Sequence, residues 1–375
     1  KRDPIGTEFP DTVKYWRLAY QVARSYRQRN SHNREFYKKV NEWAPKYHDL
    51  KDGDYHEKEL QGTGRITFVW RDHFKDAYTK GGIWSIGEDG KNLRQVINEE
   101  DLQKHLGGEP SHLLSRSQDL RYLVISGAGL VLLWDFKDNS VDTIHDGGRS
   151  GKARFTKDEK YIVYYTADGV WRYHMKTGKK ESWNIRMSGG LFFRNDKYIV
   201  SMGHGGLGLL DAKCINGPRH KPEQACAYTG KIDVQLKYRN SFMKKKVTRG
   251  SSIYHSYQGS GMSFDGKYAF YKFKYSEYDP NHVGDSKPHY IMIDIEKGYT
   301  GKEERLPLGD YIAGSADTNI VFLTKNFWDE DPNPEVYDWG GIFSYNRTTK
   351  EYKQVFTVLY NLPEQLTYSQ NPKRN

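Results

Sequence analysis

Short apolar segments separated by polar turns recur along most of the chain. Residues 81–97 read GGIWSIGEDGKNLRQVI: an alternating apolar segment, an Asp-Gly turn and a second apolar segment. Turns rich in Asp, Asn and Gly are typical of the connection between two antiparallel strands. This stretch therefore predicts a β-hairpin, whereas helical periodicity is confined to residues 15–30 and 98–106.

The same pattern returns in five further segments, at 115–144, 154–185, 191–212, 262–306 and 314–359. Each copy has a polar turn, often with Asp, then commonly Arg or Lys and Tyr, and then an apolar strand. A further strand and a polar turn lead to a fourth strand of higher polarity. Three buried strands and one wetter outer strand in roughly 40–50 residues is the period of a propeller blade. We predict an all-β fold, a single closed β-propeller of four-stranded antiparallel blades, with six blades favoured and seven as the alternative.

The repeats also divide the chain. Residues 61–375 are predicted to form the propeller, and residues 1–60 an N-terminal extension whose strand 12–21 closes the ring and protects its edges. The segment 364–372 has the pattern of the start of another copy. Tyr161 and Tyr198 are 37 positions apart, but Tyr198 and Tyr268 are 70 apart. The excess predicts an insertion at 212–257 that projects from the fourth blade.

The motifs IWSIGEDGKNLRQVI, SFDGKYAFY and FTKDEKYIVYY resemble the repeat of TolB-like (WD40-like) propellers, over nearly all of residues 60–360. The resemblance implies a propeller but no particular activity, since unrelated functions share the motif. TolB carries an α/β domain ahead of its propeller, and residues 1–60 are too few for one, so a Tol-Pal role does not carry over. Oligogalacturonate lyases are similar propellers whose metal site uses histidines late in the chain. No histidine follows His289 here, and we expect neither a metal nor another cofactor.

Charge and cysteine content limit the partners and the compartment. The 58 Lys and Arg against 48 Asp and Glu give a net charge of +10, which favours anionic partners. Cys214 and Cys226 are separated by eleven residues that include Gly217, Pro218 and Pro222, without a zinc-binding pattern. We expect a local disulfide, and with it an extracellular or periplasmic location. The polar N-terminus then implies that a signal peptide was removed, and no apolar run of 18 residues predicts a membrane span.

No catalytic motif stands out, so the candidate site comes from the predicted architecture. A GxSxG motif is absent, and HGGLG at 204–208, which begins with His204, is interpreted as a tight loop between strands. In a propeller, the loops that lead into the innermost strands meet around the central channel. In this chain they carry basic and aromatic residues suited to a carboxylate, sulfate or phosphate. With His204, the candidates are Arg29, His32, Arg34, His112, Arg149, Lys152, Arg186, His255 and Tyr257.

Two functions fit these features. The first is a non-catalytic secreted or periplasmic scaffold that binds another envelope or extracellular protein, or an anionic polysaccharide. The second is a polysaccharide lyase acting on uronates, in which His255 or Tyr257 is the base and Arg149 or Arg186 neutralises the carboxylate. Nucleic acid is not expected as a partner, because neither a helical motif nor a concentrated basic stripe is present.

Overall fold

The computed structural model covers residues 1–375. The structure describes residues 64–70, 81–107, 114–148, 153–166, 169–183, 189–195, 198–203, 206–211, 231–232, 252–279, 282–285, 289–294, 304–307, 309, 312–326, 340–358 and 364–370. For the strands between 189 and 261 and between 271 and 289, and at 325–326, 340 and 357–358, only the backbone is described.

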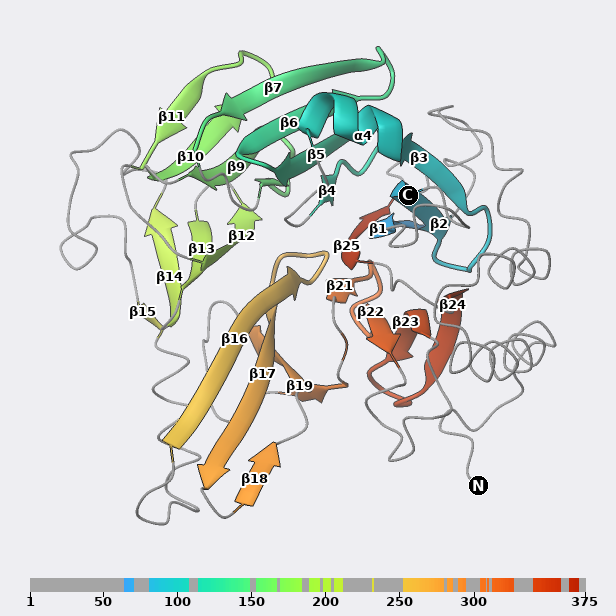
Figure 1. Ribbon diagram of the computed structural model, residues 1–375, viewed down its shortest axis with the longest axis vertical. Helices are drawn as coiled ribbons and strands as arrows, with labels where there is room; N and C mark the ends of the chain where they lie inside the picture. Colours follow the sequence, from blue (N-terminus) through green and yellow to red (C-terminus); the bar gives the residue numbers. More distant parts are fainter. Residues whose placement is uncertain are drawn as a thin grey trace, which may run out of the picture.

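Within these residues the strands pair into six antiparallel sheets that stand around a common centre (Figure 1). The first sheet contains β25 (Glu364–Gln370), β1 (Gly64–Trp70), β2 (Gly82–Gly87) and β3 (Arg94–Asn98). The second contains β4 (Ser115–Arg116), β5 (Tyr122–Gly127), β6 (Leu130–Asp135) and β7 (Ser140–Asp146). The third contains β8 (Arg154–Phe155), β9 (Tyr161–Thr166), β10 (Gly169–His174) and β11 (Lys180–Ser182). The fourth contains β12 (Gly189–Asn195), β13 (Tyr198–Gly203), β14 (Gly206–Asp211) and β15 (Lys231–Ile232).

In the last two sheets, as in the second to the fourth, the strands lie in chain order from the centre outward. The fifth contains β16 (Ser252–Met262), β17 (Tyr268–Asp279), β19 (His289–Asp294) and β20 (Glu304–Leu306), and β18 (His282–Asp285) also pairs with β17. The sixth contains β21 (Ile312–Gly314), β22 (Ile320–Asn326), β23 (Gly340–Asn346) and β24 (Tyr352–Val358). The arrangement is a β-propeller.

The prediction of a closed ring of six, or alternatively seven, four-stranded blades is wrong. Five blades are four-stranded antiparallel sheets, and the remaining sheet has five strands. The physical reason is the length of β17, whose 12 residues pair with both β19 and β18. In the described part of the chain no strand pairing joins one sheet to the next, so backbone hydrogen bonding between sheets does not close the ring.

Contacts between the innermost strands surround the centre instead. Strand β25 lies beside β4, β4 beside β8, β8 beside β12, β12 beside β16, β16 beside β21, and β21 beside β25. The blade of β1–β3 takes its innermost strand from the C-terminal segment, since β25 pairs with β1 in the register Thr67↔Thr367. The predicted ring-closing strand 12–21 lies outside the described residues. Of the predicted insertion 212–257, the structure describes only 231–232, which are β15, and 252–257, which begin β16.

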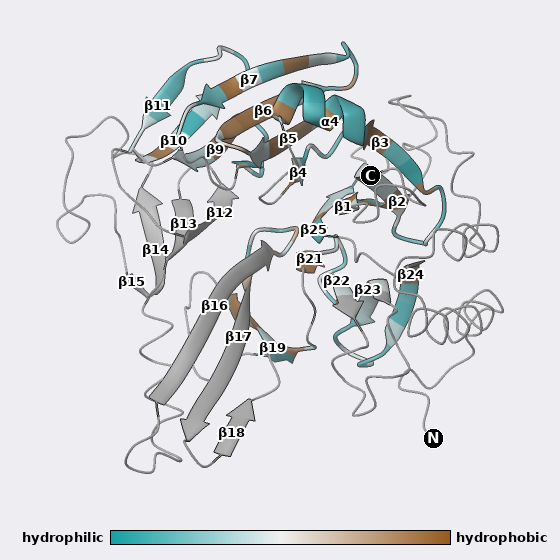
Figure 2. Cartoon of the chain, viewed as in Figure 1, coloured by the Kyte–Doolittle hydropathy of each residue, from teal (hydrophilic) through white to brown (hydrophobic). Residues whose placement is uncertain are grey.

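The core lies between neighbouring blades. One apolar cluster joins the first and sixth sheets: the ring of Phe356 on β24 lies 5.4 Å from that of Phe68 and 5.1 Å from that of Trp70, both on β1. Others join the first and second sheets, the second and third, and the fifth and sixth. Burying one such side chain stabilises the fold by about 1.5–3 kcal/mol. In Figure 2, β5 and β6 are largely hydrophobic, whereas β11 is hydrophilic.

Residues 98–106, expected to be helical, contain α4 (Glu99–Leu106). The Asn98 side chain caps its N-terminus by accepting the Asp101 backbone N–H at 2.7 Å, and Gly107 ends it in the left-handed conformation. Leu102 and Leu106 pack into the cluster between the first and second sheets. The helix thus covers an apolar seam at the outside of the propeller.

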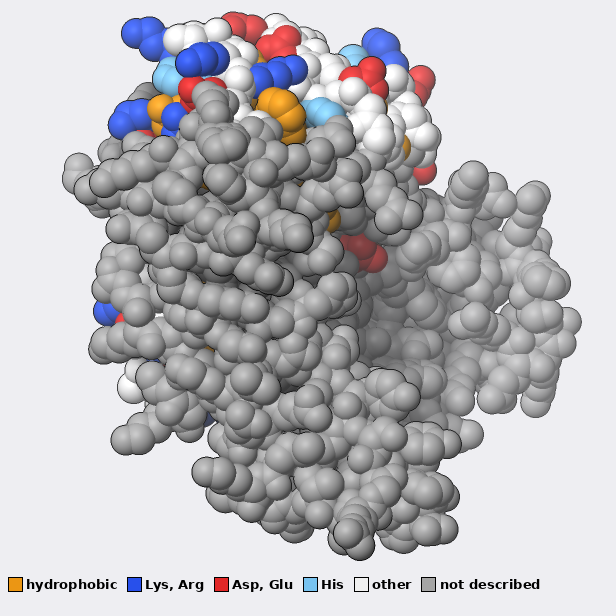
Figure 3. Space-filling model, turned by 90° about the vertical axis from the view of Figure 1, so that its left-hand side faces the viewer, with side chains coloured by type: hydrophobic (Ala, Val, Ile, Leu, Met, Phe, Trp, Pro, Cys, Tyr) orange, Lys and Arg blue, Asp and Glu red, His pale blue; other side chains and the backbone are white. Residues whose placement is uncertain are grey.

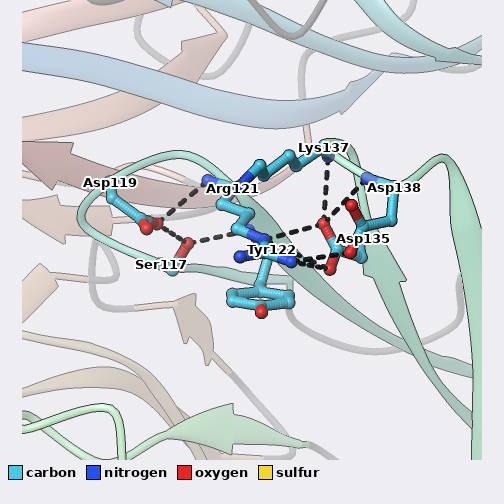
Figure 4. A network of polar contacts seen from close by, with 7 residues as sticks. All are labelled: Ser117, Asp119, Arg121, Tyr122, Asp135, Lys137 and Asp138. Atoms are coloured by element: carbon cyan, nitrogen blue, oxygen red, sulfur yellow. Dashed lines mark hydrogen bonds and ion pairs between the residues drawn. The ribbon is translucent and has the colours of Figure 1, made fainter.

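The recurrent polar turn is a hydrogen-bonded unit between the first two strands of a blade. In the second blade, Asp119 Oδ1 accepts the Ser117 hydroxyl at 2.6 Å and the Arg121 backbone N–H at 3.0 Å, and Ser117 Oγ accepts the Tyr122 N–H at 2.8 Å (Figure 4). Leu120 adopts a left-handed φ of 66°. The same bonds recur in Thr156–Tyr161 and Ser263–Tyr268. The repeated sequence therefore reflects a turn that needs Ser or Thr and Asp at fixed positions.

Figure 4 also shows how the first turn is tied to the next turn of its blade. The Arg121 guanidinium lies 2.6 Å from an Asp135 carboxylate oxygen and 2.9 Å from that of Asp138. Burial favours a higher pKa for Asp135, but the Arg121 bond and the backbone N–H groups of Lys137 and Asp138 lower that pKa overall. The arginine in this copy of the repeat thus has two carboxylate partners in its own blade.

Candidate functional site

Most of the predicted site residues lie outside the described part of the chain. These are Arg29, His32, Arg34, His112, Arg149, Lys152, Arg186 and His204, together with Cys214 and Cys226. His255 and Tyr257 lie on β16, where they pair with Tyr275 and Phe273 of β17.

A cavity of about 290 Å³ lies among the innermost strands of the propeller. Its walls come from β4, β8, β16, β21 and β25 and from the turns that follow β4, β8 and β16. The lining residues are Ser115, Arg116, Gln118, Arg154, Phe155, Thr156, Lys157, Met262, Ser263, Phe264, Gly266, Ile312, Ala313, Gly314, Leu366, Thr367 and Tyr368. Five sheets therefore contribute to one site at the propeller axis.

The charged groups among these lining residues are all basic. Arg116, Arg154 and Lys157 line the cavity, and none of its described lining residues is Asp or Glu. Burial lowers the pKa of Arg154 to about 10, which still leaves the guanidinium charged at neutral pH. Three cations in a partly enclosed space favour a bound anion, because the surrounding protein weakens solvent screening.

Two of these cations have a defined structural role as well. The Arg116 side chain is 2 % exposed; it donates to the Leu120 carbonyl at 3.1 Å and to Thr67 Oγ1 at 3.2 Å. The Lys157 ammonium donates to the Asp265 carbonyl oxygen at 3.1 Å, and so joins the turn of the third blade to that of the fifth. Arg116 thus contributes mainly a fixed positive charge, whereas Lys157 is an exposed side chain beside Thr156 in the wall.

The rest of the wall combines apolar and hydroxyl groups. Phe155, Phe264 and Leu366 provide apolar surface. The Tyr368 hydroxyl donates to Glu88 Oε2 at 2.9 Å, and burial together with the Glu88 carboxylate raises the pKa of Tyr368. A tyrosine with a raised pKa and an occupied hydroxyl is a poor general base.

The residues that line the cavity differ from those predicted for the rim. The prediction used loops that precede the innermost strands, and the cavity is lined by these strands and by the turns after them. His112, four residues before Arg116, and Lys152, two residues before Arg154, were predicted in place of these arginines. The signal that could have found them is their position one or two residues before the Ser/Thr-x-Asp turn, at 117–119 and 156–158.

The outer surface seen in Figure 3 has a different character. On the described part of that face, Lys and Arg side chains alternate with Asp and Glu rather than forming a patch of one sign. Ion pairs occur among the described residues: Arg172 lies 2.7 Å from Glu181, and Lys179 lies 3.0 Å from the same carboxylate. The described residues contain no helix with the length and hydrophobicity of a bilayer span.

Comparisons with known proteins do not assign this chain to a family. No protein-family model matches the sequence, and no curated protein matches it. Among solved structures, one of a nidogen/laminin complex has a TM-score of 0.48 and 6 % identity over 82 % of this chain and 99 % of that one. An oligogalacturonate lyase in complex with manganese has a TM-score of 0.42 and 11 % identity over 77 % and 78 %. Similarity at this level carries no functional argument, and the TolB-like resemblance is not confirmed.

Proposed function

We propose that this propeller is a non-catalytic binding protein for an anionic glycan, which it holds through an acidic group in the central cavity. The observation that carries the proposal is the convergence of Arg116, Arg154 and Lys157 on a cavity without a described carboxylate in its wall. Hydrogen bonds from a cation to a carboxylate or sulfate are stronger than neutral ones.

The size and lining of the cavity favour one sugar residue. Its volume of about 290 Å³ lies at the lower limit for ligand pockets, so a single ring with a charged substituent fits better than a large ligand. Phe155 and Phe264 offer apolar surface to the C–H face of a sugar, and Ser263 and Thr367 offer hydroxyl groups nearby. A uronate has these complementary parts.

The lyase alternative needs a base beside an arginine. In the cavity wall, Tyr368 has a raised pKa and donates its hydroxyl to Glu88, which does not favour catalysis. The candidates His255, Tyr257 and Arg149 have no described side-chain positions. Binding without catalysis is therefore the function we propose, and the secreted or periplasmic location remains part of the prediction.

The test is calorimetric titration with a uronate trisaccharide and with the neutral hexose trisaccharide of the same linkage. We expect binding of the acidic probe only, with affinity falling as salt rises, since the Debye length is about 8 Å at physiological ionic strength. Arg154→Gln should weaken binding about tenfold or more, because one hydrogen bond to a charged group is lost.

Lys137→Gln is the matched control. Lys137 is exposed in the turn between β6 and β7, so the change removes the same charge without touching the cavity. Equal binding of acidic and neutral probes, or equal loss in the two variants, would refute the proposed site. Capture of an envelope or extracellular protein that Arg154→Gln does not weaken would point to a protein partner elsewhere on the surface.

A further inference from the structure

Glu159 lies in the turn between β8 and β9, at the junction of two blades. Its carboxylate oxygen Oε1 accepts the backbone N–H of Gln118, in the turn of the neighbouring blade, at 2.5 Å. Its own backbone N–H donates to the Thr156 carbonyl oxygen at 2.9 Å. The residue adopts a left-handed φ of 55°, which is uncommon for a side chain of this size and is the conformation that this turn requires.

Both partners of Glu159 line the cavity. Gln118 and Thr156 belong to its wall, so the carboxyl group stands one hydrogen bond away from the space proposed for the anion. Gln118 also extends the connection to a third blade, because its Oε1 accepts the Gln370 backbone N–H of β25 at 2.8 Å. A change in the protonation of Glu159 therefore acts on a residue of the cavity wall through one hydrogen bond.

The charged groups that act on Glu159 are mostly acidic. Asp119 in the turn that packs against it and Asp158 in its own turn both disfavour a second negative charge. The Lys160 ammonium, next in the chain, lies 2.9 Å from Asp158, and Lys157 donates to the Asp265 carbonyl oxygen. Burial, and then these two aspartates, raise the pKa of Glu159 to about 7 in spite of the Gln118 bond.

We infer that anion binding in the central cavity is coupled to a proton on Glu159, so that the site is strong when this carboxyl is neutral and weak when it is ionised. The inference rests on the proposed function. A carboxylate at Glu159, which is hydrogen-bonded to Gln118 of the wall, repels an anion bound in the cavity, whereas the neutral carboxyl group does not. By linkage, an anion that binds the neutral form better also draws a proton onto Glu159.

The first experiment measures that proton. Titrating the wild-type protein with the uronate trisaccharide at pH 7 in bis-Tris and in Tris, two cationic buffers of different ionisation enthalpy, gives the number of protons taken up on binding. We expect net uptake of a fraction of one proton, and the affinity should fall about fivefold between pH 6 and 8, at the low end of typical coupling. Binding without proton uptake would overturn the inference, whatever the variants do.

The second experiment assigns the proton. Glu159→Gln keeps an oxygen that can accept the Gln118 N–H but cannot ionise, so it should bind with similar affinity at pH 6 and 8. Glu351→Gln removes an exposed carboxylate in the turn before β24 and should keep the wild-type pH dependence. A pH dependence that survives Glu159→Gln would refute the role of Glu159. Failure of every variant to bind at any pH would instead refute the proposed function beneath it.

Discussion

The hydroxyl of Tyr368 on β25 occupies the space that a β-carbon on Gly64 of β1 would need. The aromatic ring lies almost as close to that position, so rotation of the hydroxyl alone cannot make room. Since Tyr368 packs against Phe264 and Phe322 of other blades, this contact fixes the C-terminal strand within three blades at once. β25 can therefore complete the first blade in this way only because residue 64 is a glycine.

We predict that Gly64→Ala destabilises the protein by about 1–3 kcal/mol, the usual cost of overpacking a filled site. The free energy of unfolding from urea denaturation measures it. In a Tyr368→Ala background the same substitution should cost clearly less, because the two sites are in direct contact. Additive effects of the two changes would show that this contact does not hold β25.

A second prediction concerns the repeated turn. Asp119→Ala removes the acceptor of the Ser117 hydroxyl and of the Arg121 backbone N–H, and should cost about 1–2 kcal/mol of the unfolding free energy. Asp138→Ala is the control: it removes an exposed ion pair with Arg121, which keeps Asp135, and should cost less than about 0.5 kcal/mol. Equal losses of unfolding free energy in the two variants would show that the Asp119 hydrogen bonds stabilise the turn no more than an exposed ion pair does.

These turns also show what the sequence could predict. Ser or Thr, Asp and then Arg, Lys or Tyr at fixed spacing are local requirements, so the strands around Asp119 and Asp158 were found from the pattern alone. The polar outer strand was predicted as well, and β7 is mostly exposed where β6 is mostly buried. The strand count of each sheet was not, because the pairing of β17 with both β18 and β19 depends on strand length and on partners distant in the sequence.

The candidate site was harder to predict for a related reason. Arg116 and Arg154 are ordinary basic residues in the sequence, and only the meeting of several inner strands brings them to one cavity. The rim residues were chosen from segments that differ in length and sequence from one repeat to the next, so no repeat could fix the position of a side chain. His255 and Tyr257 were expected in a loop but belong to β16, since the strand extends over 252–262.

A third prediction is a pH dependence of stability that Glu159 causes. Its pKa is about 7 in the folded protein against 4.5 for an unperturbed glutamate. Below about pH 4.5 both states hold the proton, and its stabilising effect is complete. Between 4.5 and 7 the unfolded chain releases a proton that the folded chain retains, so this contribution falls as pH rises and is lost above about 7.

Urea denaturation at pH 5, 6, 7 and 8 measures this contribution. The difference in unfolding free energy between wild type and Glu159→Gln should shift in favour of the variant as pH rises through this range. The comparison with Glu351→Gln, which should follow the wild-type curve, separates Glu159 from the general titration of surface carboxylates. Parallel curves for wild type and Glu159→Gln would contradict the prediction.

The last prediction concerns Cys214 and Cys226, which lie outside the described residues. Their separation by a turn-rich segment of eleven residues, with no third cysteine in the chain, predicts one intramolecular disulfide. Closing a loop of this size stabilises the folded chain by about 3 kcal/mol in the chain-entropy model. Intact-mass analysis of protein alkylated under native and denaturing conditions should find no reactive thiol before reduction and two after it. Reduction should lower the melting temperature, whereas a Cys214→Ser, Cys226→Ser double variant should melt at the reduced temperature under both conditions. Two alkylated thiols in freshly purified protein would remove the disulfide and, with it, the main argument for a secreted or periplasmic binding protein.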